Sequence, residues 1–284
     1  MITKETRILI VGLGLLGGSY ARALTRAGCH VEAIDTNPDS IGYALHEGII
    51  CAGATEPEPE MLRDADLIIF GLYPKTMIDW VRAQQQYCKP GALLTDVSGV
   101  KGGVLDVIQS FLREDLEFVG CHPMAGREVS GVRNSNDAMF APANFIVVPT
   151  EKNTPQGLDT ATELGALLGF HTVTRLSMQE HDAIIGFVSQ LTHAIAVSLM
   201  TCNDDENLQN YTGDSFRDLT RIARINENLW SELFLLNKTA LIEQIDAFSG
   251  ELSKMRQMLE KEDAEGLKEM FRKSTKRRAL FDRP

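Results

Sequence analysis

The stretch CHPMAG contains a histidine, His122, whose setting suits general-base chemistry. An imidazole exchanges protons near neutral pH, so it can remove a proton from a substrate hydroxyl. Pro123 restricts the residue before it to extended backbone, and the apolar run at 117–121 is typical of a buried strand. The same stretch is equally compatible with a histidine that only ends a strand.

A second group of chemically useful residues recurs along a long apolar segment, residues 178–200. Their spacing of i, i+4, i+7 and i+11 places them on one stripe of an α-helix. Polar groups buried without partners are costly, so the stripe forms either an internal hydrogen-bond network or one wall of a cleft. In the second case His193 would meet a substrate. The members are Asp182, Gly186, Ser189 and His193.

Three arginines, Arg217, Arg221 and Arg224, follow with helical spacing of i, i+4 and i+7. Such a run is usually a solvated or salt-bridged face, and Asp214 and Asp218 are available as partners. An arginine is also a natural anchor for a substrate carboxylate, because its guanidinium donates two parallel hydrogen bonds. The residues alone leave both interpretations open.

The segment GLGLLG is a G-x-G-x-x-G pattern directly after a predicted strand and directly before a predicted helix. In this context Gly12 makes a tight turn, Gly14 lets the backbone approach a pyrophosphate, and Gly17 lets helix and strand pack closely. The helix N-terminus adds amide donors and a favourable dipole for phosphates. The predicted cofactor-binding residues in this segment are Gly12, Gly14, Leu15, Leu16 and Gly17.

Asp35 ends the next predicted strand, where an acidic side chain accepts hydrogen bonds from ribose hydroxyls. Its charge would repel the 2′-phosphate of NADP, and the following TNPDS offers no arginine to receive that phosphate. The sequence therefore predicts NAD as the cofactor. It predicts no metal site, because the six histidines are dispersed without ligand spacing.

These candidates must be positioned by the elements around them. Strand-like and helix-like segments alternate over residues 1–177, which predicts an α/β domain with an open parallel sheet of the Rossmann type. Ligands bind at the carboxyl ends of such strands, where DVSGVKG and CHPMAGRE lie. The predicted strands are 7–11, 30–35, 66–72, 92–98, 117–121, 144–150 and 171–177.

Residues 178–284 are predicted to form a second, all-helical domain for substrate binding and dimerisation. The segment 178–200 is apolar on most faces, and such a helix must be buried. The rest of the tail offers too few neighbours to cover it. We therefore expect a homodimer with intertwined helical tails, and a monomeric bundle is the alternative.

Composition narrows the class of protein. A net charge of −11 argues against a nucleic-acid or acidic-membrane partner. The five scattered cysteines predict buried thiols in a reducing cytoplasm rather than disulfides. We expect no apolar run to serve as a signal peptide or membrane span. We expect a soluble cytoplasmic protein whose ligand is a small, anionic molecule.

Several motifs in this order, GLGLLGGS, DVSGVKG, HPMAG, EHD…SQLTHA and FRDLTRIA…NLW, resemble the prephenate/arogenate dehydrogenases of tyrosine biosynthesis. The resemblance spans nearly the whole chain and is to the short form, without a regulatory or mutase domain. It implies NAD-dependent oxidative decarboxylation of prephenate to 4-hydroxyphenylpyruvate. The alternative substrate is arogenate, which would give tyrosine directly.

The resemblance also implies residue roles. His122 corresponds to the catalytic base, Arg221 to the arginine that binds the ring carboxylate, and His193 to a polar contact with the substrate. In some members a serine bonded to the catalytic histidine stands where this chain has Gly99. Ser98, one residue earlier, is the candidate for that catalytic role here.

Other interpretations remain at this stage. Arg127 replaces a threonine found in some members, and it would meet either a substrate carboxylate or Glu128. A β-hydroxyacid dehydrogenase or imine reductase would rely on a lysine or aspartate of the interdomain helix, whereas the stripe here carries His193 and lacks lysine. A non-catalytic dinucleotide-sensing regulator would leave the joint presence of His122 and Arg221 unexplained.

Overall fold

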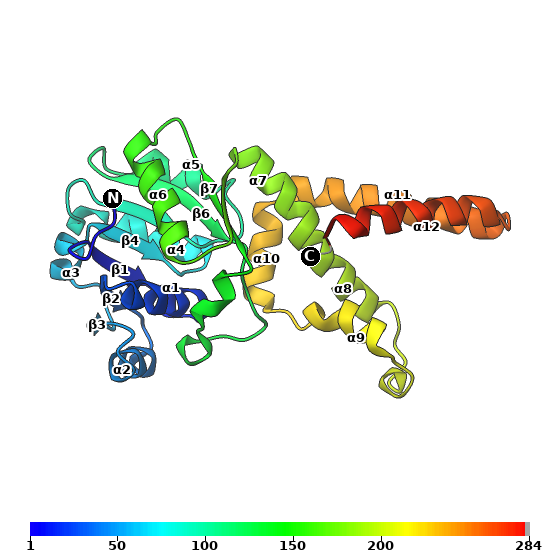
Figure 1. Cartoon of the computed structure of the whole chain (residues 1–284), viewed down its shortest axis with the longest axis horizontal. Coiled ribbons are helices and arrows are strands. Elements are labelled where there is room, and N and C mark those ends of the chain that lie inside the picture. Colours follow the sequence, from blue (N-terminus) through cyan, green and yellow to red (C-terminus); the bar gives the residue numbers. More distant parts are fainter. Residues whose placement is uncertain (282–284) are drawn as a thin grey trace. The chain divides into compact units, whose positions relative to one another are not determined.

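The computed structural model describes residues 1–281 of the chain. It contains two compact units, Met1–Asn237 and Lys238–Pro284. The first unit holds a β-sheet with its covering helices and a further set of helices, and the second is helical (Figure 1). The functional division predicted after residue 177 stays a prediction.

One eight-stranded sheet forms the centre of the first unit, in the order β3-β2-β1-β4-β5-β6-β7-β8. The order of the first six is that of dinucleotide-binding folds, with the switch point between β1 and β4. The α/β class is confirmed. The strands are β1 (Arg7–Val11), β2 (His30–Ile34), β3 (Ala52–Ala54), β4 (Leu67–Phe70), β5 (Leu93–Asp96), β6 (Glu117–Pro123), β7 (Asn144–Val148) and β8 (Thr172–Arg175).

The sheet is mixed rather than wholly parallel, which corrects the sequence prediction at one strand. β7 runs antiparallel to β6, whereas all the other neighbours are parallel. A parallel pair needs a crossover, usually a full helix. The connection between β6 and β7 contains only the short 3₁₀ turns Val132–Asn134 and Asp137–Phe140, so the chain returns in the opposite direction.

Helices cover both faces of the sheet, and the side chains of β1 show why (Figure 1). Successive strand residues point to opposite faces, so Ile8 and Ile10 join one core while Leu9 and Val11 join the other. The first core is closed by α1 (Leu15–Arg26), α2 (Pro38–His46) and α6 (Pro155–Leu167). The second is closed by α3 (Pro59–Asp64), α4 (Pro74–Gln84) and α5 (Leu105–Phe111).

The long apolar segment is helical but not regular. A capping box between Ser177 and Glu180 starts α7 (Met178–Ile185), a π-helical turn follows at Gly186–Leu191, and α8 (Thr192–Thr201) completes it. The wider π turn changes the angular phase of the residues after it. The predicted straight stripe from Asp182 to His193 is therefore wrong.

The arginine-rich segment also breaks. α9 (Asp214–Thr220) ends in a 3₁₀ turn at Arg221–Ala223, and Arg224 has a non-helical backbone with φ −75° and ψ 89°. The three arginines therefore do not share a continuous helical face, in contrast to the prediction. Asn226 then caps α10 (Glu227–Leu236), which packs against the second core.

The segment Met178–Thr201 has one further property that the sequence prediction missed. It is 24 residues long and contains an 18-residue window with a mean hydropathy of 1.7, so by length and composition alone it passes the test for a membrane span. The prediction that no segment passes this test is wrong, because the few polar residues within the window lower its mean hydropathy only modestly. Ile184, Phe187 and Val188 of this segment are each more than 40% exposed in a single chain.

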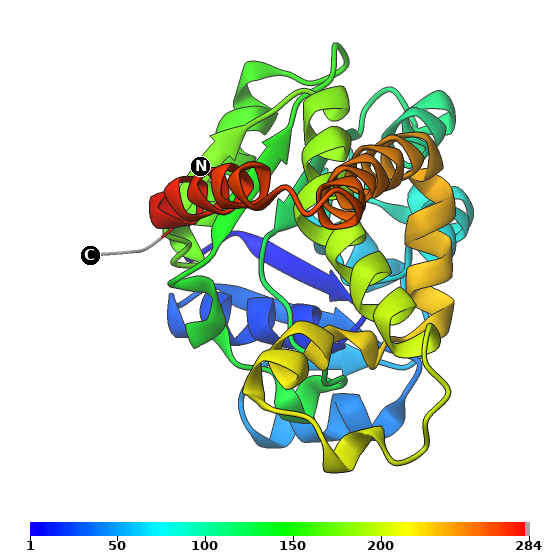
Figure 2. The same ribbon diagram turned by 90° about the vertical axis from the view of Figure 1, so that its right-hand side faces the viewer.

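The second unit consists mainly of α11 (Lys238–Glu260) and α12 (Ala264–Arg278). Figure 2 shows the short turn between them, where Glu262 has a positive φ of 53°. Exposed Ile245, Leu252 and Leu259 recur every seven residues on α11. A seven-residue apolar repeat is typical of a helix that packs against another helix.

The glycine pattern generates a prediction about stability. A methyl group at Gly17 would lie 1.9 Å from the carbonyl oxygen of Gly12, and overpacking of this kind costs about 1–3 kcal/mol. Gly17→Ala should lower the free energy of unfolding by this amount. The measurement is urea unfolding followed by circular dichroism.

Gly42→Ala is the matched control, because Gly42 is also helical and a methyl group there would meet nothing within 4 Å. Alanine is the better helix former, so this variant should gain up to about 1 kcal/mol. Equal unfolding midpoints for the two variants would show that close packing at Gly17 is not a constraint.

Candidate active site

His122 lies at the carboxyl end of β6, where a parallel sheet binds its ligands. The neighbouring strand β5 ends at Asp96 on the same edge, and the loop after it approaches the histidine. A Cβ atom placed on Gly99 of this loop would be 3.8 Å from His122 Nε2 and 3.7 Å from Leu233 Cδ1. The Nε2 side of the imidazole therefore faces Gly99 and α10.

The other ring nitrogen of His122 begins a chain of partly buried hydrogen bonds. His122 Nδ1 is 2.9 Å from His181 Nε2, and His181 Nδ1 is 2.6 Å from an Asp182 carboxylate oxygen. The same carboxylate accepts hydrogen bonds from the backbone amides of Lys101, at 3.0 Å, and Gly102, at 2.6 Å. His181 is fully buried, so its partners decide where its proton resides.

This chain assigns the tautomer of both histidines. An ionised carboxylate only accepts hydrogen bonds, so His181 Nδ1 donates to Asp182. The Nε2 atom of neutral His181 is then an acceptor, and His122 Nδ1 must donate to it. The remaining lone pair of His122 is on Nε2, the nitrogen that faces Gly99. The geometry thus prepares His122 Nε2 to accept a proton.

The electrostatics keep both rings neutral at neutral pH. Burial, together with His181 and Lys101, holds the pKa of His122 well below its ordinary value. Burial also lowers the pKa of His181, and the opposing influence of Asp182 does not overcome it. Burial alone would raise the pKa of Asp182, but hydrogen bonds from His181 and from the Gly102 and Lys101 amides bring it below its usual range.

A second network, which is buried, fixes the loop that follows β5. Lys101 Nζ and an Asp96 carboxylate oxygen are 2.6 Å apart, and both side chains are fully buried. The other Asp96 oxygen accepts a hydrogen bond from the Cys121 amide at 3.0 Å. Removing one partner of such a buried ion pair is strongly destabilising. This network therefore ties the Lys101 loop to the residue before His122.

The structure does not bring Ser98 to His122. The Ser98 hydroxyl is directed toward the carboxylate of Asp96 and the carbonyl oxygen of Val100, and Lys101 Nζ lies 3.2 Å from it. The neighbour of His122 is instead His181, the histidine of the EHD motif, to which the sequence assigned no role. Ser98 therefore holds the loop, and the predicted contact between Ser98 and His122 is not formed.

Cys121 lies beside the proposed base but is unsuited to proton transfer at neutral pH. Burial is the main reason that the pKa of its thiol is raised to about 12. The thiol therefore stays protonated, and His122 remains the base candidate at this strand end.

His193 has a different environment, on α8. Its Nδ1 lies 2.9 Å from the Ser189 carbonyl oxygen, to which it donates. The ring stacks on Trp230 of α10, with centroids 3.6 Å apart and planes at 29°. Partial burial lowers the pKa of His193. Trp230 had no assigned role in the sequence, because a tryptophan at helical spacing is indistinguishable from a core residue.

Arg221 forms an ion pair with Glu128, a residue of the loop after His122. Their charges also reach His193, whose pKa Glu128 raises and Arg221 lowers. Thus His193, Arg221 and Glu128 form one cluster, although they are far apart in sequence. Arg127 is exposed, and Glu128, one of its two expected partners, is taken by Arg221.

The glycine-rich segment fits a dinucleotide. Gly12 has φ +97° and contacts the backbone of Gly71, whereas a Cβ on Gly14 would meet nothing within 4 Å, so that part of the backbone faces open space. The N-terminus of α1 has no side-chain cap, which leaves its amides available to phosphates. Asp35 accepts a hydrogen bond from the Leu13 amide at 2.6 Å, so the carboxylate lies beside the loop.

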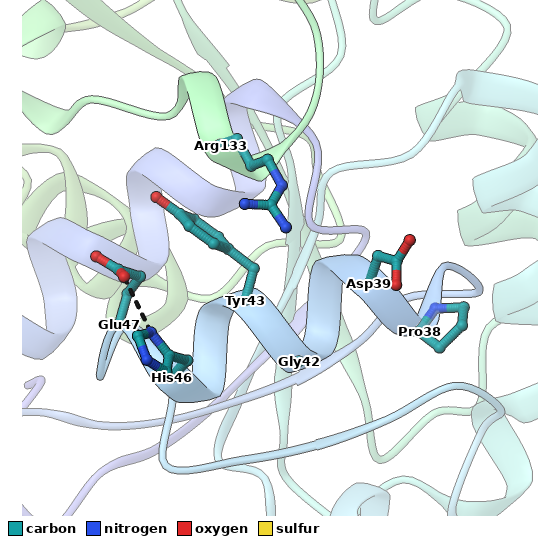
Figure 3. A pocket seen from close by; sticks show the side chains of 7 residues that line it. All are labelled: Pro38, Asp39, Gly42, Tyr43, His46, Glu47 and Arg133. Atoms are coloured by element: carbon teal, nitrogen blue, oxygen red, sulfur yellow. Dashed lines mark hydrogen bonds and ion pairs between the residues drawn. The ribbon is translucent and has the colours of Figure 1, made fainter.

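Two surface cavities lie away from this chemistry, and neither is lined by His122. One, of about 450 Å³, lies against α2, where Arg133 stacks over Tyr43 at 4.5 Å (Figure 3). The other, of about 480 Å³, lies around the end of α8 and the start of α9. The chain of hydrogen bonds from His122 to Asp182, rather than either cavity, therefore locates the candidate active site.

Comparisons with known proteins agree with this arrangement. Residues 20–174 match the family described as "Prephenate dehydrogenase, nucleotide-binding domain", and residues 177–273 match "Prephenate dehydrogenase, dimerization domain". The prephenate dehydrogenase of Bacillus subtilis is 32% identical over 276 residues, which cover 95% of this chain and 74% of that protein.

Two further relatives extend over nearly their whole length. The cyclohexadienyl dehydrogenase of Zymomonas mobilis is 28% identical over 98% of this chain and 96% of its own. The crystal structure of prephenate dehydrogenase from Aquifex aeolicus, in complex with hydroxyphenyl propionate and NAD⁺, has a TM-score of 0.89 and 31% identity over 98% of both chains.

The lowered pKa of His122 generates a prediction about pH and stability. An unfolded histidine titrates near pH 6.5, and the pKa of folded His122 is lower. Between these values the unfolded chain binds more protons, so the free energy of unfolding rises with pH and levels off above about pH 6.5. His122→Gln should flatten this rise, measured by urea unfolding from about pH 4 to pH 8.

His46→Gln is the matched control, because the His46 side chain is 82% exposed. This variant should retain the rise of the free energy of unfolding with pH that His122→Gln loses. A His122→Gln variant that also retains this rise would contradict the burial of a neutral imidazole.

Proposed function

The chain belongs to the prephenate dehydrogenase family, and from this premise we propose that it converts prephenate to 4-hydroxyphenylpyruvate by oxidative decarboxylation in tyrosine biosynthesis. It is an NAD-dependent oxidoreductase of this family. The observation that carries the assignment to this site is the hydrogen-bond chain that leaves the lone pair of His122 on Nε2. A base in that position is what the reaction requires at the substrate hydroxyl.

The proposed reaction breaks three bonds of the substrate. His122 Nε2 accepts the hydroxyl proton, while bound NAD supplies the acceptor for a hydride from the carbon that carries the hydroxyl. The carboxylate on the opposite ring carbon leaves as CO₂, and its bonding electrons complete the aromatic ring. The protonated His122 then returns its proton to the oxygen of the new ring, which gives the phenol of 4-hydroxyphenylpyruvate. His181 and Asp182 hold the imidazole in the orientation and tautomer that accept the proton.

Arg221 is the proposed anchor for the ring carboxylate. It is paired with Glu128, but the two side chains are 63% and 39% exposed. An exposed ion pair contributes only about 0–1 kcal/mol, so a substrate carboxylate can replace Glu128 at little cost. A bidentate contact in a closed site would be considerably stronger.

His193 and Trp230 are proposed to form the neighbouring wall of the substrate site. Because His193 Nδ1 donates to Ser189, its Nε2 is the acceptor of the neutral ring. The stacked indole fixes the plane of that ring. His193 is therefore held ready to accept a hydrogen bond from a polar group of the substrate.

The NAD-binding residues are proposed as predicted from the sequence. Amides at the start of α1 bind the pyrophosphate, next to the open face of Gly14, and Asp35 binds the adenosine ribose. Asp35 keeps acceptor capacity for this, because each of its oxygens accepts one backbone amide, from Leu13 and Asn37. The contacting residues are Gly12, Gly14, Leu15, Leu16, Gly17 and Asp35.

We further propose that the enzyme is a cytoplasmic homodimer that acts on a small anionic substrate, without nucleic-acid or membrane partners. The match to a dimerization domain supports association through residues 177–273. The exposed apolar side chains of Met178–Thr201 and the seven-residue repeat on α11 supply surfaces that a second copy would cover. A partner helix explains the high hydropathy of this segment without a membrane.

The first prediction from this proposal concerns the base. The wild-type protein should reduce NAD in the presence of prephenate and release 4-hydroxyphenylpyruvate. His122→Asn should lower kcat by about two to four orders of magnitude, because it removes the proton acceptor. NAD binding, measured by calorimetry, should be unchanged.

Asparagine is chosen because its amide can still donate to His181 Nε2, so the rest of the chain of hydrogen bonds is retained. Prephenate and arogenate should be assayed side by side, and prephenate should give the higher kcat/KM. Absence of turnover with both substrates would refute the proposed function, and near-normal turnover by His122→Asn would remove His122 from the mechanism.

The second prediction concerns the anchor. Arg221→Ala should raise KM for prephenate about 10- to 100-fold, since a charge-assisted hydrogen bond is worth about 1.5–3 kcal/mol. Arg217→Ala is the matched control, because Arg217 is a similarly exposed arginine paired with Asp214 on the preceding helical turn. If both variants show the same KM, the assignment of Arg221 is wrong.

A further inference from the structure

Three potential metal ligands meet at the opposite end of β2 from the cofactor loop. His30 is the first residue of β2, and Glu32 is two residues further on, so both side chains lie on one face of the strand. Cys51 immediately precedes the edge strand β3, in which Ala52 pairs with Glu32. At about 3.3 Å per residue, Asp35 lies about 16 Å along the chain from His30.

The donor atoms are already grouped. One ligand atom from each of these three residues lies within 4.8 Å of the others. His30 Nε2 is 2.9 Å from Glu32 Oε1 and 3.4 Å from Cys51 Sγ. Ligands of a tetrahedral zinc ion, with bonds of about 2.0–2.3 Å, are separated by about 3.3–3.6 Å. Only small side-chain movements would therefore be needed.

The chemistry of the donors selects a class of ion. A thiolate, an imidazole and a carboxylate form the ligand set of Zn²⁺ and similar divalent transition metals, whereas Mg²⁺ and Ca²⁺ prefer oxygen alone. Cys51 is exposed, and the other two side chains are partly buried, so an ion can enter from solvent. The thiol now donates to the Val31 carbonyl oxygen at 3.1 Å, and that proton would be released on binding.

We propose that His30, Glu32 and Cys51 bind one divalent transition-metal ion of the Zn²⁺ class, with water as the fourth ligand. The site shares no residue with the proposed active site. It links β2 to the three-residue edge strand β3, so the bound ion should stabilise the fold. The sequence predicted neither this site nor the exposed thiol, because Cys51 is distant in sequence and was expected to be buried.

The test uses the full chain, purified in chelator and titrated with Co²⁺ and with Zn²⁺. The wild type should bind one equivalent, with a thiolate-to-cobalt absorption band in the near ultraviolet and a concentration-dependent rise in Tm. Cys51→Ala should lose the band and weaken Zn²⁺ binding by at least about 100-fold, since even outer-shell changes cost 10- to 100-fold. Glu32→Gln should weaken binding without abolishing the band.

Two control variants separate this site from other donors. Cys202→Ala removes the other exposed cysteine, and His46→Ala removes a histidine paired with Glu47 in a pocket whose seven lining residues include no cysteine (Figure 3). Both should bind like the wild type. Thermal unfolding in chelator checks that each variant is folded. If Cys51→Ala is not folded, weaker Zn²⁺ binding by Glu32→Gln tests the site instead.

The proposal is overturned if the wild type shows no saturable binding, or if Cys51→Ala binds as tightly as the wild type. The second result would place the ion elsewhere, for instance at the histidines near the active site. Turnover of prephenate should be similar in wild type and Cys51→Ala, so this test does not depend on the proposed reaction.

Discussion

The proposed chemistry depends on one carboxylate that can only accept hydrogen bonds. Two backbone amides of the loop after β5 donate hydrogen bonds to the Asp182 carboxylate and fix its position. His181 Nδ1 donates to the same carboxylate, and this hydrogen bond fixes the orientation of the His181 ring. His181 in turn dictates the proton position on His122. The proposed base is thereby held with its lone pair on Nε2, the nitrogen that faces Gly99. The low pKa of His122 follows from the same burial that makes the hydrogen bonds strong.

The fold brings this carboxylate to the sheet by packing α7 against the loop that holds Lys101. That loop is itself fixed by the buried ion pair of Lys101 and Asp96. α7 is held from its other side, where the Asn237 side chain donates to the Asp182 carbonyl oxygen at 2.9 Å and to Gln190 at 2.8 Å. The π-helical turn that contains Gln190 thus helps to support the proposed active site, and π-helical turns are frequent at functional sites.

Much of the fold could be predicted from the sequence, because alternating strands and helices have strong local signals. The antiparallel direction of β7 could not be predicted, because it depends on the absence of a helix between β6 and β7. Local patterns indicated His122 and the glycine loop as candidate site residues. They could not reveal that Ser98 turns toward Asp96, nor that His181 bonds to His122, because both depend on packing between distant segments. The regular helical spacing of the polar residues and of the arginines likewise did not indicate the π turn or the break at Arg221.

The central claim is that neutral His122 carries its proton on Nδ1 and presents a bare Nε2. Nitrogen-15 NMR of the histidine rings, near neutral pH, measures this directly. The account predicts a protonated Nδ1 and an unprotonated Nε2 for His122, with the same tautomer for His181. Loss of that tautomer at His122 in Asp182→Asn would show that the carboxylate imposes it. A wild-type His122 with its proton on Nε2, or with both nitrogens protonated, would contradict the account.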